Sequence, residues 1–314
     1  MPGAPYRISN SEIQTFQRCR RKWWLSYIES WTPKPSVGTY VGPLALGSRI
    51  HAALEQKYKN GKSLLGEHSR MVEEARIMMS GDGFGLEKLD NEAELGRIML
   101  EGYEEWVDDE GLDAGLDVIG VEQILELPML AGKVILMGKL DLRIARKRDD
   151  TRAALDFKTS ANFNDLLTTM HMAPQLLTYM TLDHVAGPGA TDMSTRIDGA
   201  VYRMLKKVKR GPRAIPPFYQ EVTVRHNVFT LRSFWRRLQG VLTNMHDTRR
   251  AIEDGGDPLV LAYPTPNRNC TWDCPFYKIC FMFDDGSGVD DALESDFVRH
   301  DPYAYYGDRE PGSE

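Results

Sequence analysis

The feature that most constrains the fold of this chain is a change in the spacing of its apolar residues. Before residue 110 they recur at intervals of three and four, as Leu46, Ile50 and Leu54 do, which predicts amphipathic helices. In the middle of the chain apolar and polar residues alternate instead, which predicts strands. The strands are expected at residues 117–127, 133–146, 152–159, 197–208 and 218–225.

Helices are expected on both sides of these strands. The first begins at Ser9 or Ser11 and runs through residue 28, and Glu12 follows Ser9 at the spacing of a capping box. The others are expected at residues 44–59, 67–79, 87–109, 173–185 and 228–253. This order predicts an α/β (α+β) fold, in which a mixed central sheet is flanked by helices and preceded by an N-terminal helical subdomain.

The chain is expected to have four parts. They are an N-terminal helical part at 1–110, a strand-rich core at 111–255, a cysteine cluster at 256–283 and an acidic tail at 284–314 that is expected to be flexible. No apolar run reaches the roughly 18–20 residues that span a bilayer, so no membrane partner is expected. The first residues lack the pattern of a secretory signal, which favours a cytoplasmic location.

Charge is distributed unevenly along the chain. Between residues 67 and 126 there are eighteen acidic and four basic residues, whereas residues 196–250 contain thirteen basic and three acidic ones. A local basic stretch can face a polyanion even in a chain whose net charge is −6. The candidates for phosphate contacts are Lys206, Lys207, Lys209, Arg210, Arg236 and Arg237.

The most informative stretch is Gly138-Lys-Leu-Asp141 followed by Asp156-Phe-Lys158. Alternate residues of a strand share a face, so Asp156 and Lys158 are expected to point the same way, and a hairpin would bring Asp141 beside Asp156. Two carboxylates and a lysine suit Mg²⁺-dependent phosphodiester hydrolysis, because the carboxylates hold the cation and the lysine orients water or offsets developing charge. The alternative is an ion pair at a strand end.

Two further pairs lie at helical spacing. His51 and Glu55 are four residues apart on one expected helix, and Gln175 and Tyr179 are four apart on another, so each pair shares a helix face. Taken alone, His51 would be a structural histidine and the second pair a coincidence of helical spacing.

The cysteines are clustered. Cys270, Cys274 and Cys280 lie within eleven residues, and Cys19 stands some 250 residues earlier. This clustering indicates a shared metal site. Four thiolates suit either Zn²⁺ or an iron–sulfur cluster, and their spacing does not choose between the two.

Taken in order, these motifs resemble the RecB-like branch of the PD-(D/E)XK nucleases. An early cysteine helix, G-x-x-x-H, G-x-x-D, D-x-K, Q-x-x-x-Y and a terminal cysteine cluster follow one another from about Ile8 to Cys280. The chain is most similar to the CRISPR-associated "Cas-four" exonucleases, to their phage relatives and to the AddB nuclease domain. The resemblance implies a restriction-endonuclease-like fold, with the nuclease core at 111–255.

The resemblance also implies roles for the residues of the central motifs. His51, Asp141 and Asp156 would bind Mg²⁺ or Mn²⁺, and the backbone carbonyl of Phe157 would complete the metal shell. Lys158 would be the catalytic lysine. These nucleases often have Glu where this chain has Asp156, a difference of one methylene that keeps the charge.

The remaining motif residues would act around that centre. Gln175 and Tyr179 would position the DNA strand near the scissile phosphate, so the resemblance assigns them to the catalytic set with Asp141, Asp156 and Lys158. Glu55 and Glu122 are expected to be supporting residues only.

For the cysteines, the resemblance favours a [4Fe–4S] cluster, because these nucleases close an early cysteine onto three late ones. The ligands would be Cys19, Cys270, Cys274 and Cys280, with Zn²⁺ as the alternative. The usual spacing between the first two late cysteines is x2, whereas this chain has x3. Either metal would link the two ends of the chain and contribute to folding.

DNA is the expected partner. Arg20 and Arg21, which lie among several aromatic residues, are candidates for contacts to a single strand. An alternative is that these tryptophans, Trp23 among them, pack around the metal site.

The expected activity is that of a divalent-metal-dependent deoxyribonuclease. We expect an exonuclease acting on single-stranded DNA ends in recombination, repair or phage DNA metabolism, located in the host cytoplasm if the chain is phage-encoded. One rival is a non-catalytic DNA-end binding or adaptor module of the same fold. The other is a structural protein linked by zinc, in which the D-x-K motif is an accident.

Overall fold

The computed structural model describes residues 4–186 and 197–306. The chain forms two compact units, each built from separate stretches of the sequence. Unit 1 comprises residues 1–34, 126–138 and 232–314, and unit 2 comprises residues 35–125 and 139–231. Because β3 (Leu116–Met129), β4 (Val134–Arg146) and α9 (Val228–Glu253) cross these boundaries, each supplies residues to both units.

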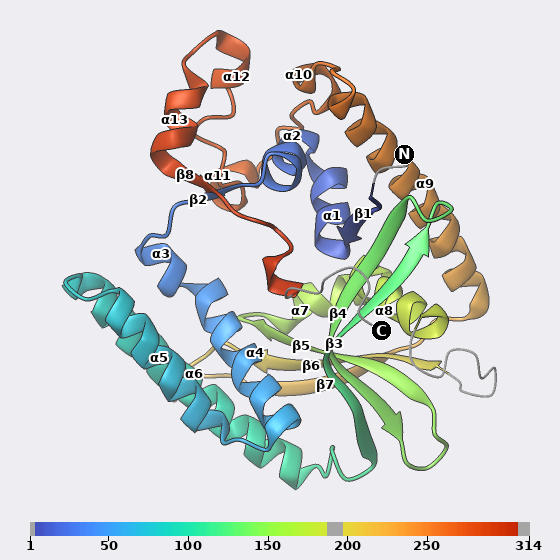
Figure 1. Cartoon of the computed structure of the whole chain (residues 1–314). Coiled ribbons are helices and arrows are strands. Elements are labelled where there is room, and N and C mark those ends of the chain that lie inside the picture. The colour runs from blue at the N-terminus through green and yellow to red at the C-terminus, as the bar shows by residue number, and fades with distance from the viewer. Residues whose placement is uncertain (1–3, 187–196, 307–314) are drawn as a thin grey trace. The chain divides into compact units, whose positions relative to one another are not determined.

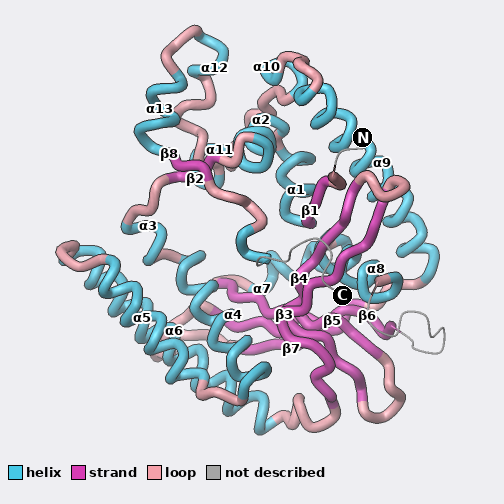
Figure 2. The backbone as a smooth tube through the Cα atoms, viewed as in Figure 1, coloured by secondary structure: helices cyan, strands magenta, loops and turns pink. Residues whose placement is uncertain are grey.

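The sheet of unit 2 carries the central motifs. The second half of β4 pairs antiparallel with β5 (Arg152–Ser160), and β5 pairs in parallel with β6 (Ile197–Lys206). β6 in turn pairs antiparallel with β7 (Tyr219–Val224), and β3 pairs with β4. These strands lie side by side in Figures 1 and 2, and the expected mixed sheet is confirmed.

One face of this sheet is covered by two helices, α4 (Pro43–Asn60) and α6 (Gly83–Asp109), and α5 (Leu64–Met78) packs against both of them. α5 and α6 form an antiparallel hairpin (Figure 1). α4 and α6 bury their apolar stripes against alternate residues of the strands, as the period of two requires. The buried side chains at the centre of this core include Ile50, Leu54, Leu100, Tyr103, Leu142, Ile144, Leu155, Phe157 and Val201.

The other face of the same sheet receives α8 (Pro174–Val185), which begins with proline at its first turn. An ion pair fixes α8 there, because Asp183 accepts a hydrogen bond of 2.7 Å from Nε of Arg143 on β4. Arg143 points away from the face that Leu142 and Ile144 present to α4–α6, so the two helical layers lie on opposite sides. The short helix α7 (Phe163–Thr169) precedes α8 and was not predicted.

Unit 1 begins with β1 (Tyr6–Ser9), which pairs in parallel with the first residues of β4 and was not predicted. Ser9 caps α1 (Asn10–Arg18) by accepting a hydrogen bond from the Glu12 N–H, as expected, but the capping box is not formed, because the Ser9 N–H donates to the Tyr303 hydroxyl. The prediction of one helix through residue 28 is wrong. Cys19 adopts an extended conformation between α1 and α2 (Arg20–Trp23), and a π-helical turn follows at Trp24–Ile28.

The C-terminal part of unit 1 consists of short elements. They are α10 (Pro258–Leu261), α11 (Cys270–Asp273), α12 (Met282–Asp285), α13 (Val289–Asp296) and β8 (Phe297–Arg299). β8 pairs with β2 (Trp31–Pro33), and Leu293 and Phe297 of the predicted acidic tail are buried in a small core with Leu25. Residues 307–314 of that tail lie outside the described residues.

The remaining helix, α3 (Val37–Tyr40), belongs to unit 2 and precedes α4. Across residues 4–186 and 197–306, no helix has both the length and the apolar composition needed to cross a membrane.

Candidate active site

Asp156 and Lys158 lie on the same face of β5, as the alternation of strand residues predicts. Oδ2 of Asp156 is 2.6 Å from Nζ of Lys158, and the Asp156 side chain is 2% exposed. A carboxylate at this depth is costly unless a cation accompanies it. The lysine is therefore one partner of a buried charge and not an accident of the strand surface.

Asp141 reaches the same place from β4. The antiparallel register pairs Leu142 with Leu155, so Asp141 lies at the level of Asp156. Oδ2 of Asp141 accepts a hydrogen bond of 2.9 Å from the Phe157 N–H and lies 3.3 Å from Nδ1 of His51. The expected hairpin thus places the second carboxylate, and α4 supplies the imidazole beside it.

α8 completes the arrangement. Oε1 of Gln175 accepts a hydrogen bond of 2.9 Å from Lys158 Nζ, while Nε2 of Gln175 donates to Oδ1 of Asp156 at 3.3 Å. The same nitrogen donates to the Tyr179 hydroxyl at 2.9 Å, across one helical turn. Gln175 therefore orients Lys158, Asp156 and Tyr179 together.

Six residues that are distant in sequence thus form one polar network in unit 2. They are His51, Asp141, Asp156, Lys158, Gln175 and Tyr179. The network joins α4, β4 and β5 to α8 on the other face of the sheet.

Burial and mutual repulsion act on the carboxylates in different ways. Burial, with the nearby charge of Asp141, raises the pKa of Asp156 despite the ammonium of Lys158. Burial also opposes ionisation of Asp141, but His51 and the Phe157 N–H outweigh it and lower the pKa of Asp141. For His51, burial is outweighed by the hydrogen bond to Asp141 and by the carboxylate charges, so the pKa of His51 is raised.

The chemistry of these donors fits a hard divalent cation. The buried carboxylate of Asp156 lies beside the ammonium of Lys158, and its charge acts together with those of Asp141 and His51. Carboxylate oxygens and an imidazole nitrogen are ligands for Mg²⁺ or Mn²⁺. Among the described residues, no three His, Cys, Asp or Glu side chains are already arranged to hold a metal ion.

A second charged pair lies beside the network and was not anticipated. Lys139, two residues before Asp141 on β4, forms an ion pair with Glu122 of β3. Glu122 has a positive φ of 49°, which no local sequence signal announces. The signal that could have identified Lys139 is its i, i+2 relation to Asp141 within the same motif.

The four cysteines meet in unit 1. Cys19, Cys270, Cys274 and Cys280 line one cavity of about 450 Å³. Cys19 lies at the break between α1 and α2, where its backbone is extended and not helical. Backbone N–H groups of the loop at 265–267 face two of the sulfurs, at 3.5 Å for Cys19 and 3.3 Å for Cys270.

Arg20 and Arg21, the expected DNA contacts of the first helices, differ in exposure. Arg20 is partly exposed and its guanidinium donates to Asn244. Arg21 is 2% exposed and holds both the Asp284 carboxylate and the Cys280 carbonyl. We therefore correct the expectation for Arg21, whose guanidinium is committed to the packing of the cysteine segment. Trp23 is buried too, with its indole N–H bound to Glu12.

The basic residues after β6 lie at the end of the central sheet of unit 2. Lys207 Nζ donates to the Pro43 carbonyl at the start of α4, and Lys209 Nζ to Asn91. The guanidinium of Arg210 stacks 3.7 Å above the Phe218 ring, and Lys206 donates to the Ile215 carbonyl. On α9, in unit 1, Arg236 and Arg237 are exposed.

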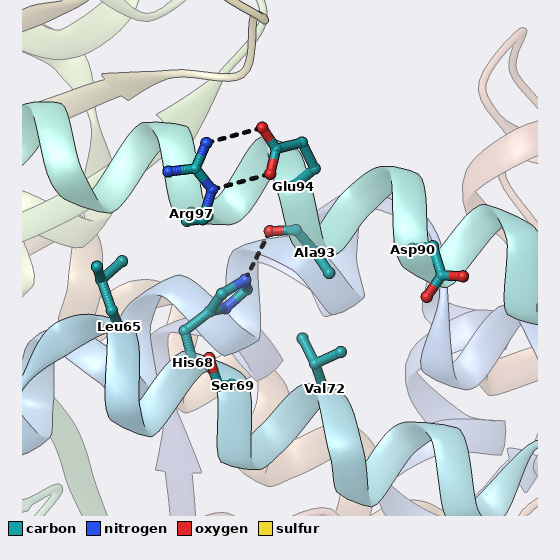
Figure 3. Close-up of a pocket in the computed structure, with 8 residues that line it drawn as sticks. All are labelled: Leu65, His68, Ser69, Val72, Asp90, Ala93, Glu94 and Arg97. Atoms are coloured by element: carbon teal, nitrogen blue, oxygen red, sulfur yellow. Dashed lines mark hydrogen bonds and ion pairs between the residues drawn. The ribbon is translucent and has the colours of Figure 1, made fainter.

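A separate hollow of about 300 Å³ lies on the α5–α6 hairpin (Figure 3). Within it Arg97 pairs with Glu94, and His68 Nε2 contacts the Ala93 carbonyl at 3.1 Å. It contains no carboxylate–lysine arrangement, so we do not consider it as the active site.

The chain is similar to known nucleases in sequence pattern and in fold. The family model described as "PD-(D/E)XK nuclease superfamily" matches residues 7–281, which contain the whole network and all four cysteines. A crystal structure named "putative exonuclease", from Eubacterium rectale, is similar with a TM-score of 0.51 and 12% identity over 86% of each chain.

A second solved structure, SSO0001, is 14% identical over 61% of this chain and 72% of that one. Its TM-score of 0.26 is too low to support a conclusion about the fold. No match was found among curated proteins.

Proposed function

Since the chain belongs to the PD-(D/E)XK nuclease superfamily, we propose that it is a divalent-metal-dependent deoxyribonuclease, and specifically an exonuclease acting on single-stranded DNA ends. The observation that carries the proposal is the convergence of Asp141, Asp156, Lys158 and His51 in one network built from two strands and a helix of unit 2. An ion pair between Asp156 and Lys158 alone would not need the second carboxylate and the imidazole beside it.

In this proposal Asp141, Asp156 and His51 hold Mg²⁺ or Mn²⁺, and the Phe157 carbonyl is a further ligand. When bound, the cation would polarise the phosphate and neutralise charge in the transition state. The side chains would have to close on the ion, since they are not so arranged in the described conformation.

In this proposal Lys158 stabilises the negative charge that develops on the phosphate. Its ammonium is held by Gln175 Oε1 at 2.9 Å, so it is oriented before substrate arrives. As the water oxygen bonds to phosphorus and the P–O bond to the leaving group breaks, negative charge on the phosphate oxygens increases, and Lys158 donates a hydrogen bond to it. Gln175 and Tyr179, one turn apart on α8, would position the DNA strand next to the scissile phosphate.

We further propose that the cysteines hold a [4Fe–4S] cluster, as in the RecB-like branch. All four cysteines line one cavity of about 450 Å³, which has room for a group of several atoms. Brown protein that contains iron and sulfide supports the cluster, whereas colourless protein with stoichiometric zinc would contradict it.

The direct test of function compares end-labelled linear and circular single-stranded DNA, incubated with Mn²⁺ or EDTA and anaerobically purified protein. The proposal predicts that only linear DNA is degraded, and only with Mn²⁺. Cleavage of circles would identify an endonuclease. Binding without cleavage of either substrate would favour an adaptor.

A further inference from the structure

The Glu122–Lys139 ion pair lies beside the proposed metal site. Lys139 and Asp141 are alternate residues of β4, so their side chains leave the same face of the strand. The side chains of Glu122 and Lys139 are 9% and 17% exposed, so both charges are largely removed from water. A buried ion pair seldom adds net stability, which directs attention to a role in the site.

The surroundings of this pair are acidic. The negative charges of Asp141 and Glu55 both act on the Glu122 carboxylate, which places it in the same electrostatic environment as the proposed metal ligands. Lys139 is thus a cation among several carboxylates. If the Glu122 carboxylate were removed, the flexible Lys139 side chain could turn toward Asp141 and compete with a metal ion for that ligand.

Glu122 is well placed to prevent this competition. It extends from β3, the strand that pairs with β4, and its backbone adopts a positive φ of 49°. Such a conformation costs free energy for a residue other than glycine, and strain of this kind is found where the position of a side chain matters.

We propose that Glu122 is a positioning residue that holds Lys139 away from Asp141, so that Asp141 remains available to the divalent cation. This inference rests on the proposed function. It assigns the Glu122 carboxylate to Lys139 and not to the cation, and the double variant below tests that assignment.

The test measures Mn²⁺ binding to full-length protein without DNA, by electron paramagnetic resonance of the free ion. Glu122→Gln should weaken binding about tenfold or more, the usual loss when a partner that orients a metal ligand is removed. Glu122→Gln combined with Lys139→Met should restore binding to within about threefold of the parent, because no ammonium is left to compete. Glu104→Gln, which breaks the Lys57–Glu104 pair of 3.0 Å elsewhere in unit 2, is the matched control and should change nothing.

Each alternative role gives a different pattern. If Glu122 were itself a metal ligand, the double variant would stay as weak as the single one, and if the pair were only structural, Mn²⁺ binding would not change; either result overturns the proposal. If Glu122→Gln does not fold, Lys139→Met alone decides, since weaker binding in that variant contradicts competition.

The same measurements distinguish failure of this inference from failure of the proposed function. If unaltered protein fails to bind Mn²⁺, both are overturned. If unaltered protein binds and Asp141→Asn does not, the metal site stands, and an unchanged Glu122→Gln variant would overturn this inference alone.

Discussion

The buried carboxylate of Asp183 gives a quantitative test of how α8, and with it Gln175, is held on the sheet. Its side chain is 2% exposed, accepts a hydrogen bond of 2.7 Å from Arg143 and lies 4.0 Å from Nε of Arg152. Asp183→Asn keeps the shape of the side chain but removes the negative charge that the buried Arg143 guanidinium contacts. Removing one partner of such a pair costs about 3–5 kcal/mol, and since Asn retains an acceptor oxygen we expect about 3 kcal/mol.

The assay is urea unfolding followed by circular dichroism, with the midpoint compared at equal m. The control is Asp254→Asn, the same substitution in the Arg250–Asp254 pair, whose side chains are 50% and 66% exposed. That exposed pair should contribute less than about 1 kcal/mol. If the two variants lost the same small amount of stability, the account of Asp183 as the anchor of α8 would be refuted.

Three other predictions concern the packing of both units. Burial raises the pKa of Glu12 from 4.5 to about 7, so the folded state binds the extra proton and stability should fall by about 3 kcal/mol as pH rises from about 4.5 to 7. Urea titrations across that range should show this slope, and Glu12→Gln should remove it; a flat profile for the parent would contradict the assignment. Cys274→Ala should lose absorbance near 400 nm and cooperative unfolding, whereas unchanged metal content and melting would disprove a metal-linked fold. Gly96→Ala would place a Cβ 2.4 Å from Cε1 of His68, so thermal melting should report a loss of about 1–3 kcal/mol. Gly240→Ala, with no atom within 4 Å, should be neutral or stabilising, and equal effects would rule out the steric argument.

Local periodicity was sufficient to predict which of the candidate site residues share a strand or helix face. The shared face of Asp156 and Lys158 follows from strand geometry, and the contact of Gln175 with Tyr179 follows from one turn of helix. Their convergence with His51 depended on the order of the motifs, because periodicity does not say which helix covers which strand.

Long-range contacts determined the features that periodicity missed. The segment around Cys19 has continuous helical propensity, yet the helix is interrupted at Cys19, because tertiary contacts outweigh the local propensity. β1 pairs with residues of β4 that lie about 130 positions later, and a strand of four residues is too short to show a local sequence pattern. Arg21 and Trp23 are buried although their neighbours suggested a DNA surface, because Asp284 and Glu12 provide partners from distant segments.

The central claim is that the network around Lys158 hydrolyses DNA, and single-turnover cleavage tests it most directly. Lys158→Ala and the exposed-lysine control Lys133→Ala would be compared with the parent at saturating Mn²⁺, with DNA affinity measured in parallel by fluorescence anisotropy. The account predicts that Lys158→Ala lowers the cleavage rate at least about a hundredfold with DNA affinity unchanged, while Lys133→Ala cleaves like the parent. Cleavage by Lys158→Ala within a few-fold of the parent would contradict it.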